Sequence, residues 1–177
     1  MKKIKETPMY WYLLTLTVAA AAGLQGWRTL FNNFAVESVD LNGFHIGVIQ
    51  SVREVPGFLA LCAIFLMIFI KEQRLSALSV ICMGIGICLT GFLPTFSGLI
   101  LTTLLMSFGF HYYETTNQSL ILQHFDEYQS PLVMGSQRSM MSLVCIIVGV
   151  RVYNEIRRTD VDSLSELRNV QAQKGER

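Results

Sequence analysis

Five apolar blocks of about 20 residues or more, joined by short links, constrain this chain more than any other feature of its sequence. At 1.5 Å per residue each block reaches about 28 Å or more, which is long enough to cross the hydrocarbon layer of a membrane. A small water-soluble core requires no such blocks. The sequence therefore predicts an all-α fold, a polytopic transmembrane helical bundle. Its expected membrane helices cover about residues 10–34, 46–70, 75–93, 97–125 and 132–150.

The composition excludes several other classes of protein. Charged residues make up 15% of the chain, whereas soluble domains carry about 25%. The net charge is +1 and the charges lie at block ends rather than in a basic stripe, so nucleic acid is not an expected partner. The sequence contains neither HExxH nor GxSxG, which argues against an intramembrane enzyme. We expect a lipid bilayer as the first partner, and no cofactor.

The chain divides into a bundle over residues 1–150 and a polar tail over residues 151–177. The tail holds 6 basic and 5 acidic residues among its 27. Within it, Ser163-Leu164-Ser165-Glu166 has the pattern of a capping box at the start of a helix. The tail is therefore expected to be a short helix or disordered.

Basic residues in the links predict the orientation of the bundle in the membrane. Lys2, Lys3 and Lys5 precede the first block and Lys71 and Arg74 follow the second, whereas the links at 35–45 and 94–96 contain no Lys or Arg. Because basic residues concentrate on the cytoplasmic side, the N-terminus and this basic loop are expected in the cytoplasm of a bacterium, with the bundle in its inner membrane. An alternative is a cleavable signal peptide that ends near 19–23.

Four of the five blocks carry polar residues on one helical face. Residues spaced at i, i+3, i+4 and i+7 share a side of a helix, and polar groups inside a membrane face a bundle interior or a cavity because lipid penalises them. We expect these stripes to line a pathway for a small solute. They are Gln25, Arg28 and Asn32, then Gln50, Arg53, Glu54 and Gly57, then His111, Glu114, Thr115 and Gln118, and finally Gly135, Arg138, Ser139 and Ser142.

Depth along the helices proposes ion pairs between stripes. Arg28 and Glu54 lie roughly 5–15 Å below the outer helix ends, and Glu114 and Arg138 lie roughly 10–17 Å from the inner ends. If Arg28 pairs with Glu54 near the outer end and Glu114 pairs with Arg138 near the inner end, Arg53 has no partner. The excess positive charge suggests an anionic ligand, a chloride ion, a lipid headgroup or a residue of absent chain as the remaining partner.

Simpler roles for the same residues stay open. Arg28 and Arg53 are long enough to extend to the outer headgroups, and Glu114–Arg138 is also suited to a bridge that only fixes helix packing. His111 and Glu114 form an H-x-x-E pair able to ligate a metal or relay a proton. Two ligands do not make a metal site, so no metal is predicted and the proton relay is the stronger interpretation.

Two backbone features predict how the helices pack. The third block has no polar stripe, but its Gly84, Gly86 and Gly91 predict a close approach to a neighbouring helix. Pro56 lies inside the second block and predicts a kink there. A neighbouring helix must then satisfy the carbonyl that the proline leaves without a donor.

Three segments share their order and spacing with one known family. Residues 41–50 read L-N-G-F-H-I-G-V-I-Q at the entry to the second helix, residues 69–74 form the basic loop, and residues 107–110 read S-F-G-F within a long fourth helix. In these features residues 1–150 resemble the N-terminal half of a major facilitator superfamily (MFS) transporter. Within the loop, Leu66, Ile70 and Gln73 stand where the family motif has Gly, Asp and Gly.

The resemblance implies a secondary transporter that moves a small solute by alternating access between two six-helix halves. The chain then supplies five helices of the first half, and it is expected to be a fragment whose sixth helix and C-terminal half are missing. Proton-coupled members of the family have an arginine on the fourth helix, at a position that corresponds to about Leu105 here. Because this chain has no arginine there, Glu114 is the local candidate for proton coupling. An alternative of another class is a five-helix membrane subunit that transports nothing and serves assembly.

Overall fold

The computed structural model describes the backbone of residues 2–175 and the side chains of residues 4–159. Over this range the chain is helical and forms no strand, which confirms the all-α class. Each of the five apolar blocks corresponds to a long helical segment, and only the second is interrupted. The elements are α1 (Lys2–Lys5), α2 (Pro8–Glu37), α3 (Gly43–Phe58), the 3-10 turn η1 (Leu59–Leu61), α4 (Cys62–Phe69), α5 (Glu72–Thr90), α6 (Phe96–His124) and α7 (Gln129–Gly175).

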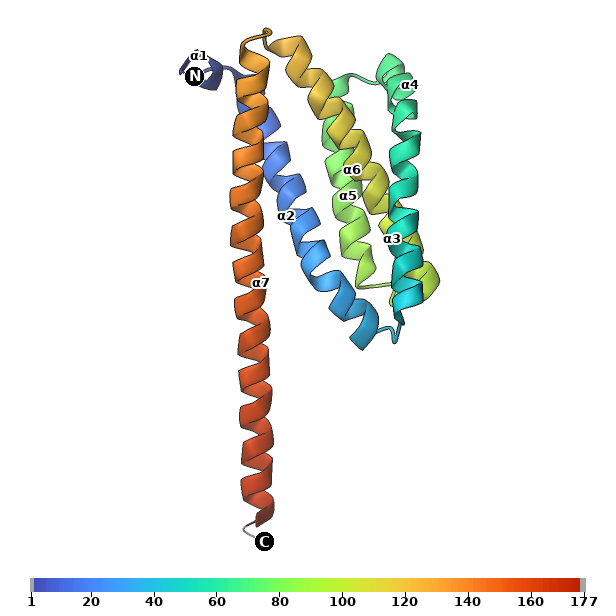
Figure 1. Ribbon diagram of the computed structural model, residues 1–177, viewed down its shortest axis with the longest axis vertical. Coiled ribbons are helices and arrows are strands. Elements are labelled where there is room, and N and C mark those ends of the chain that lie inside the picture. The colour runs from blue at the N-terminus through green and yellow to red at the C-terminus, as the bar shows by residue number, and fades with distance from the viewer. Residues whose placement is uncertain (1, 176–177) are drawn as a thin grey trace.

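Successive long helices run in opposite directions because the links between them are short (Figure 1). The side chain of Asn42 accepts a hydrogen bond from the backbone N–H of His45 and starts α3, and Thr95 accepts from Gly98 in the same way at α6. These side-chain caps satisfy backbone donors that have no partner within the helix. The N-terminal end, the α4–α5 link and the α6–α7 link consequently lie at one end of the bundle.

Three helical segments are long and apolar enough to cross a membrane. They are Gly43–Phe69, which joins α3, η1 and α4, then Glu72–Thr90, and Gln129–Thr159 at the start of α7. The helices α2 and α6 are also long, but neither is among the candidate membrane spans of the described residues. By length and composition, three of the five expected membrane helices are therefore candidate spans.

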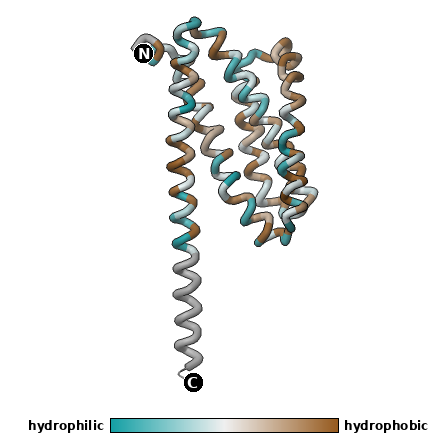
Figure 2. Tube along the Cα trace, viewed as in Figure 1, coloured by the Kyte–Doolittle hydropathy of each residue, from teal (hydrophilic) through white to brown (hydrophobic). Residues whose placement is uncertain are grey.

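The outer surface carries large apolar side chains that a soluble protein would bury. On the segment that joins α3 and α4, Phe58 is 82% exposed and Phe69 is 85% exposed. The apolar residues of α4 and of the first half of α7 are visible in the hydropathy colouring (Figure 2). Apolar patches of this extent mark contact with a membrane or with other protein.

A close crossing of α5 and α6 holds the centre of the bundle. A Cβ added at Gly86 would lie 2.5 Å from the backbone nitrogen of Met106, and one at Gly109 would meet the backbone of Met83. The predicted close approach is thus confirmed at Gly86. At Gly84 no atom lies within 4 Å, and at Gly91 the nearest atom is the carbonyl oxygen of Cys88 on the same chain segment, at 4.0 Å, so these two glycines make no close contact with a neighbouring helix.

The helix around Pro56 depends on a hydroxyl group from α6. Proline has no N–H to donate to the carbonyl one turn earlier, so the local backbone lacks a donor. The hydroxyl of Ser107 donates to the carbonyl oxygen of Arg53 at 2.5 Å. The hydroxyl of Tyr112 donates to the carbonyl oxygen of Leu59 at 3.4 Å. Helix α6 therefore donates to carbonyls on both sides of Pro56. The carbonyl that the proline leaves without a donor is that of Val52, and no described side chain donates to it, so the predicted contact is not found.

Ser107→Ala is expected to lower the free energy of unfolding by about 1 kcal/mol, because the carbonyl of Arg53 loses its donor from α6. Ser139→Ala is the matched control, since that exposed hydroxyl bonds only within its own helix, to Gly135. Unfolding of the full chain in bicelles measures both. Equal losses for the two variants would contradict the role given to Ser107.

The last helix continues past residue 150, where the fifth membrane helix was expected to end. Helix α7 continues without a break from Gln129 to Gly175. No proline or glycine occurs between residues 151 and 174, so nothing in that stretch stops the helix. The polar tail is therefore a continuation of the fifth helix, and no new helix begins at the capping-box sequence at residues 163–166.

Candidate functional site

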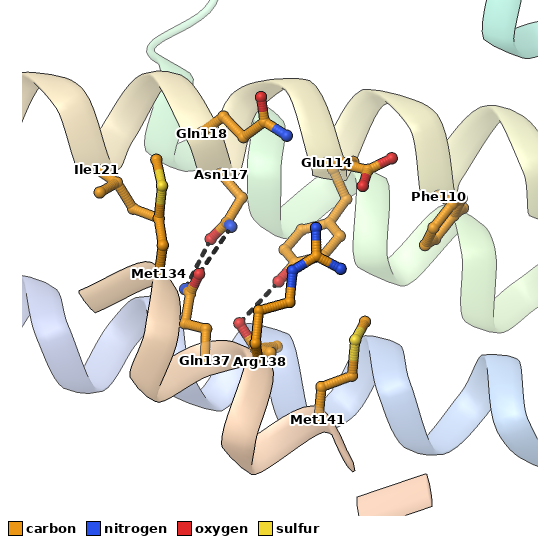
Figure 3. A pocket seen from close by; sticks show the side chains of 11 residues that line it. Phe110, Glu114, Asn117, Gln118, Ile121, Met134, Gln137, Arg138 and Met141 are labelled. Atoms are coloured by element: carbon orange, nitrogen blue, oxygen red, sulfur yellow. Dashed lines mark hydrogen bonds between the residues drawn. The ribbon is translucent and has the colours of Figure 1, made fainter. Parts of the chain in front are cut away.

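Two cavities that both touch Phe110 gather most of the predicted site residues. The large cavity, of about 250 Å³, lies between α2, α6 and α7 (Figure 3). The small cavity, of about 70 Å³, lies between α2, α3 and α6. The large cavity is lined by Thr17, Phe110, Tyr113, Glu114, Asn117, Gln118, Ile121, Met134, Gln137, Arg138 and Met141. The small cavity is lined by Leu24, Arg28, Arg53, Glu54, Met106, Ser107, Phe110 and His111.

Hydrogen bonds join the three helices around the large cavity in pairs. The hydroxyls of Thr17 on α2 and Tyr113 on α6 lie 2.9 Å apart. A second hydroxyl contact, of 2.7 Å, connects α2 to α7; its partners are Tyr10 and Ser136. The cavity is thus framed by polar contacts that already have their partners.

The third link is an amide pair between α6 and α7. Asn117 donates to Gln137 at 3.1 Å, and Gln137 donates back to Asn117 at 3.0 Å. The dashed lines in Figure 3 show this reciprocal pair beside the cavity. Gln137 is only 6% exposed, so its amide depends on Asn117 for hydrogen bonding.

Glu114 and Arg138 both line the large cavity but form no ion pair. Among the described side chains, only one ion pair has its charged atoms within 4.0 Å, and it joins other residues. The two residues of the predicted inner pair therefore line the same cavity but do not form an ion pair. Neither side chain forms a hydrogen bond within residues 4–159, so each charge faces the cavity without a protein partner there.

The small cavity contains that ion pair, and it corrects the predicted outer pairing. The guanidinium of Arg53 donates to one carboxylate oxygen of Glu54 at 2.7 Å and 3.0 Å. Arg28, predicted to pair with Glu54, lines the same cavity but has no ion-pair partner in the described range. Depth along a helix does not specify which way a side chain points. Arg53, rather than Arg28, pairs with the carboxylate of Glu54, its neighbour in the sequence. The excess positive charge is therefore on Arg28 rather than on Arg53.

His111 lies at the junction of the small cavity and the interrupted helix. An added Cβ at Gly57 would lie 3.2 Å from the imidazole ring, so the glycine leaves room for the histidine. Glu114, its predicted partner in a relay, lines the other cavity. No group of three or more His, Cys, Asp or Glu in the described part of the chain is arranged to hold a metal ion.

The remaining predicted residues lie partly outside the cavities. Gln118 lines the large cavity, whereas Gln25 hydrogen-bonds Thr29 on its own helix, and neither Gln25 nor Gln50 lines either cavity. Lys71, in the link between α4 and α5, and Arg74, in the first turn of α5, are both exposed.

The stripe predicted on the fifth helix is rotated by one residue. Gly135, Ser139 and Ser142 are exposed on the outside of the bundle, and of that stripe Arg138 alone lines the cavity. The face that does line it consists of Met134, Gln137, Arg138 and Met141.

Sequence reasoning missed the amide pair and the hydroxyl contacts. Asn117 is adjacent to the predicted stripe residue Gln118, and Gln137 is adjacent to Arg138. The spacing 113, 114, 117 and 121 on α6 is also i, i+1, i+4 and i+8, which marks a wider face than the one predicted. A stripe one residue wider would have included both members of the pair.

Comparison with known proteins gives no relative. No family model matches the chain, and neither a curated protein nor a solved structure matches it.

Proposed function

We propose that the chain is the helical bundle of a secondary transporter that moves a small solute across a membrane by alternating access. The single observation that carries the proposal is the convergence of charged and amide side chains on two adjoining cavities, while the outer faces of α4 and α7 are apolar. Charged groups inside a membrane cost at least about 2.5–3.5 kcal/mol each and are retained where they face a pathway or a partner.

The proposal places all five long helices across the cytoplasmic membrane, with the N-terminus and the basic loop inside. The greater polarity of α2 and α6 is consistent with this arrangement, because these two helices supply residues to both cavities. A helix that faces a pathway is expected to be less apolar than one that faces lipid.

The open sides of the cavities fit an additional set of helices. Glu54, Gln118 and Arg138 are exposed in the described bundle, so one side of the pathway is uncovered. Covering it with a second half is the arrangement that the MFS resemblance implies. The charges of the two cavities, three arginines against two glutamates, favour a solute that carries at least one negative group. Glu114 is the proposed carrier of a coupling proton.

The proposal is tested by the access of water to the cavity in the membrane. In a cysteine-free background, Gln118→Cys is expected to react with a membrane-impermeant charged thiol reagent at least about tenfold faster than Leu78→Cys. Each position lies six residues from the same end of the bundle, 118 before the end of α6 and 78 after the start of α5. Leu78 is exposed on an apolar face, which the proposal assigns to lipid.

The rates are measured on the full chain in sealed vesicles of both orientations. Because the two positions have the same depth, a difference in rate reports the cavity rather than the distance to the surface. If both cysteines react equally slowly with the reagent, the transporter proposal is wrong and the non-transporting membrane subunit is favoured. The long extension of α7 beyond the bundle is the feature that suits such a subunit, since it offers a helix for docking.

A further inference from the structure

The large cavity contains two opposite charges that the protein does not use for its own packing. Four of its five neutral polar residues form links between helices, Thr17 with Tyr113 and Asn117 with Gln137, and the fifth, Gln118, forms no hydrogen bond in the described range. Glu114 on α6 and Arg138 on α7 are left without a hydrogen bond or an ion pair among the described side chains. A ligand is therefore the available partner for each charge.

The two charges come from different walls of the cavity. Glu114 projects from α6 and Arg138 from α7, with the space of about 250 Å³ between the helices (Figure 3). A ligand with only a negative group would leave the carboxylate uncompensated, and a ligand with only a positive group would leave the guanidinium uncompensated. Both costs are avoided by a ligand that carries one group of each sign.

Apart from these polar residues, the lining is apolar. Phe110, Ile121, Met134 and Met141 supply an aromatic ring, a branched side chain and two flexible thioethers. Methionine side chains adapt to apolar groups of different shape. The volume suits a molecule of the size of an amino acid rather than of a sugar chain or a nucleotide.

We propose that the large cavity binds a small zwitterion whose cationic group pairs with Glu114, whose anionic group pairs with Arg138, and whose apolar substituent lies against Phe110 and the two methionines. This assignment rests on the proposed transport function and specifies the substrate class of the same site. The hydrogen bonds of Thr17 with Tyr113 and of Asn117 with Gln137 fix the relative positions of the helices from which the two charges project.

The test uses ligands that differ only in charge. The full chain in lipid nanodiscs is titrated calorimetrically with leucine, methionine and phenylalanine as zwitterions. Two analogues of leucine, 3-methylbutylamine without the carboxylate and 4-methylpentanoate without the amine, complete the series. At least one zwitterion is expected to bind, and leucine is expected to bind at least about tenfold more tightly than either analogue. Failure of all three zwitterions to bind, or equal binding of leucine and its analogues, overturns the proposal.

Substitutions assign the two groups. Glu114→Gln is expected to remove the advantage of leucine over 4-methylpentanoate, and Arg138→Gln to remove its advantage over 3-methylbutylamine. Arg138→Lys, which keeps the charge but loses the planar guanidinium, is expected to retain the preference for the zwitterion with weaker binding. If both Gln variants lower thermal stability without ligand and leave the ligand series unchanged, the two residues are a structural pair and the proposal is wrong.

The outcome is separable from that of the proposed function. Fast labelling of Gln118→Cys together with no binding of any zwitterion leaves a transporter with another substrate class. Charge-selective binding of leucine without its accumulation in proteoliposomes leaves a zwitterion site in a protein that does not transport.

Discussion

Gly86→Ala is expected to lower the free energy of unfolding by up to about 2 kcal/mol, whereas Gly84→Ala, two residues earlier on the same helix, is expected to raise it slightly. A Cβ at position 86 would lie 2.5 Å from the nitrogen of Met106 and 2.9 Å from the carbonyl oxygen of Thr102. Backbone atoms cannot rotate away, so α5 and α6 must separate. Such overpacking costs about 1–3 kcal/mol, which outweighs the roughly 1 kcal/mol that alanine gains over glycine in a helix.

The control and the partner glycine make this prediction specific. At Gly84 no atom lies within 4 Å, so only the gain in helix propensity remains. Gly109→Ala is expected to destabilise the same crossing from α6, where the added methyl group would meet the backbone of Met83. The double variant at 86 and 109 should lose less than the sum, because one separation of the helices relieves both contacts. Denaturant titration of the full chain in bicelles measures all four; equal effects at 84 and 86 would falsify the close crossing.

Asn117→Leu is expected to lower the free energy of unfolding by about 1–2 kcal/mol. The substitution leaves the buried amide of Gln137 without its partner, and an unsatisfied buried amide costs about 1–3 kcal/mol. Hydrogen bonds between membrane helices contribute less, with measured values up to about 1.7 kcal/mol, and this lower range sets the expectation. Gln118→Leu is the matched control, because that adjacent side chain is exposed and forms no hydrogen bond in the described range.

A double-mutant cycle separates the amide pair from other effects. Asn117→Leu combined with Gln137→Leu should recover most of the loss of either single variant, since both amides are then replaced by apolar groups. The cycle is read from the same unfolding titrations. Additive losses in the double variant would mean that the two amides do not depend on each other.

Helix positions could be predicted from this sequence because hydrophobic length is a local property. The block predicted at 97–125 became α6 at Phe96–His124, and the block at 75–93 became α5 at Glu72–Thr90. The 3-10 turn at Leu59–Leu61 was not predicted, although Pro56 predicted an irregularity nearby. The number of residues disturbed beyond a proline depends on which hydroxyls a neighbouring helix supplies, and that is a tertiary property.

Side-chain pairing was less predictable because it depends on rotation about the helix axis. Depth placed Arg28 near Glu54 correctly, as both line the small cavity, but it did not anticipate that Arg53 would pair with its own neighbour. On α7, Met134 and Gln137 replaced Gly135 and Ser139 on the cavity side. A single-residue step turns a side chain by about 100° on an α-helix, so a stripe defined by polarity alone is easily rotated out of the site.

The length of α7 has a mechanical consequence for the bundle. From residue 150 to residue 175 the helix adds about 38 Å at 1.5 Å per residue, and Figure 1 shows this part extending past the other helices. A small rotation of a rigid helix about one end produces a large displacement of its other end. Tilting α7 by 10° at the cavity would displace residue 175, about 55 Å away along the helix, by about 10 Å, so a small rearrangement at Arg138 would be transmitted as a large movement outside the bundle.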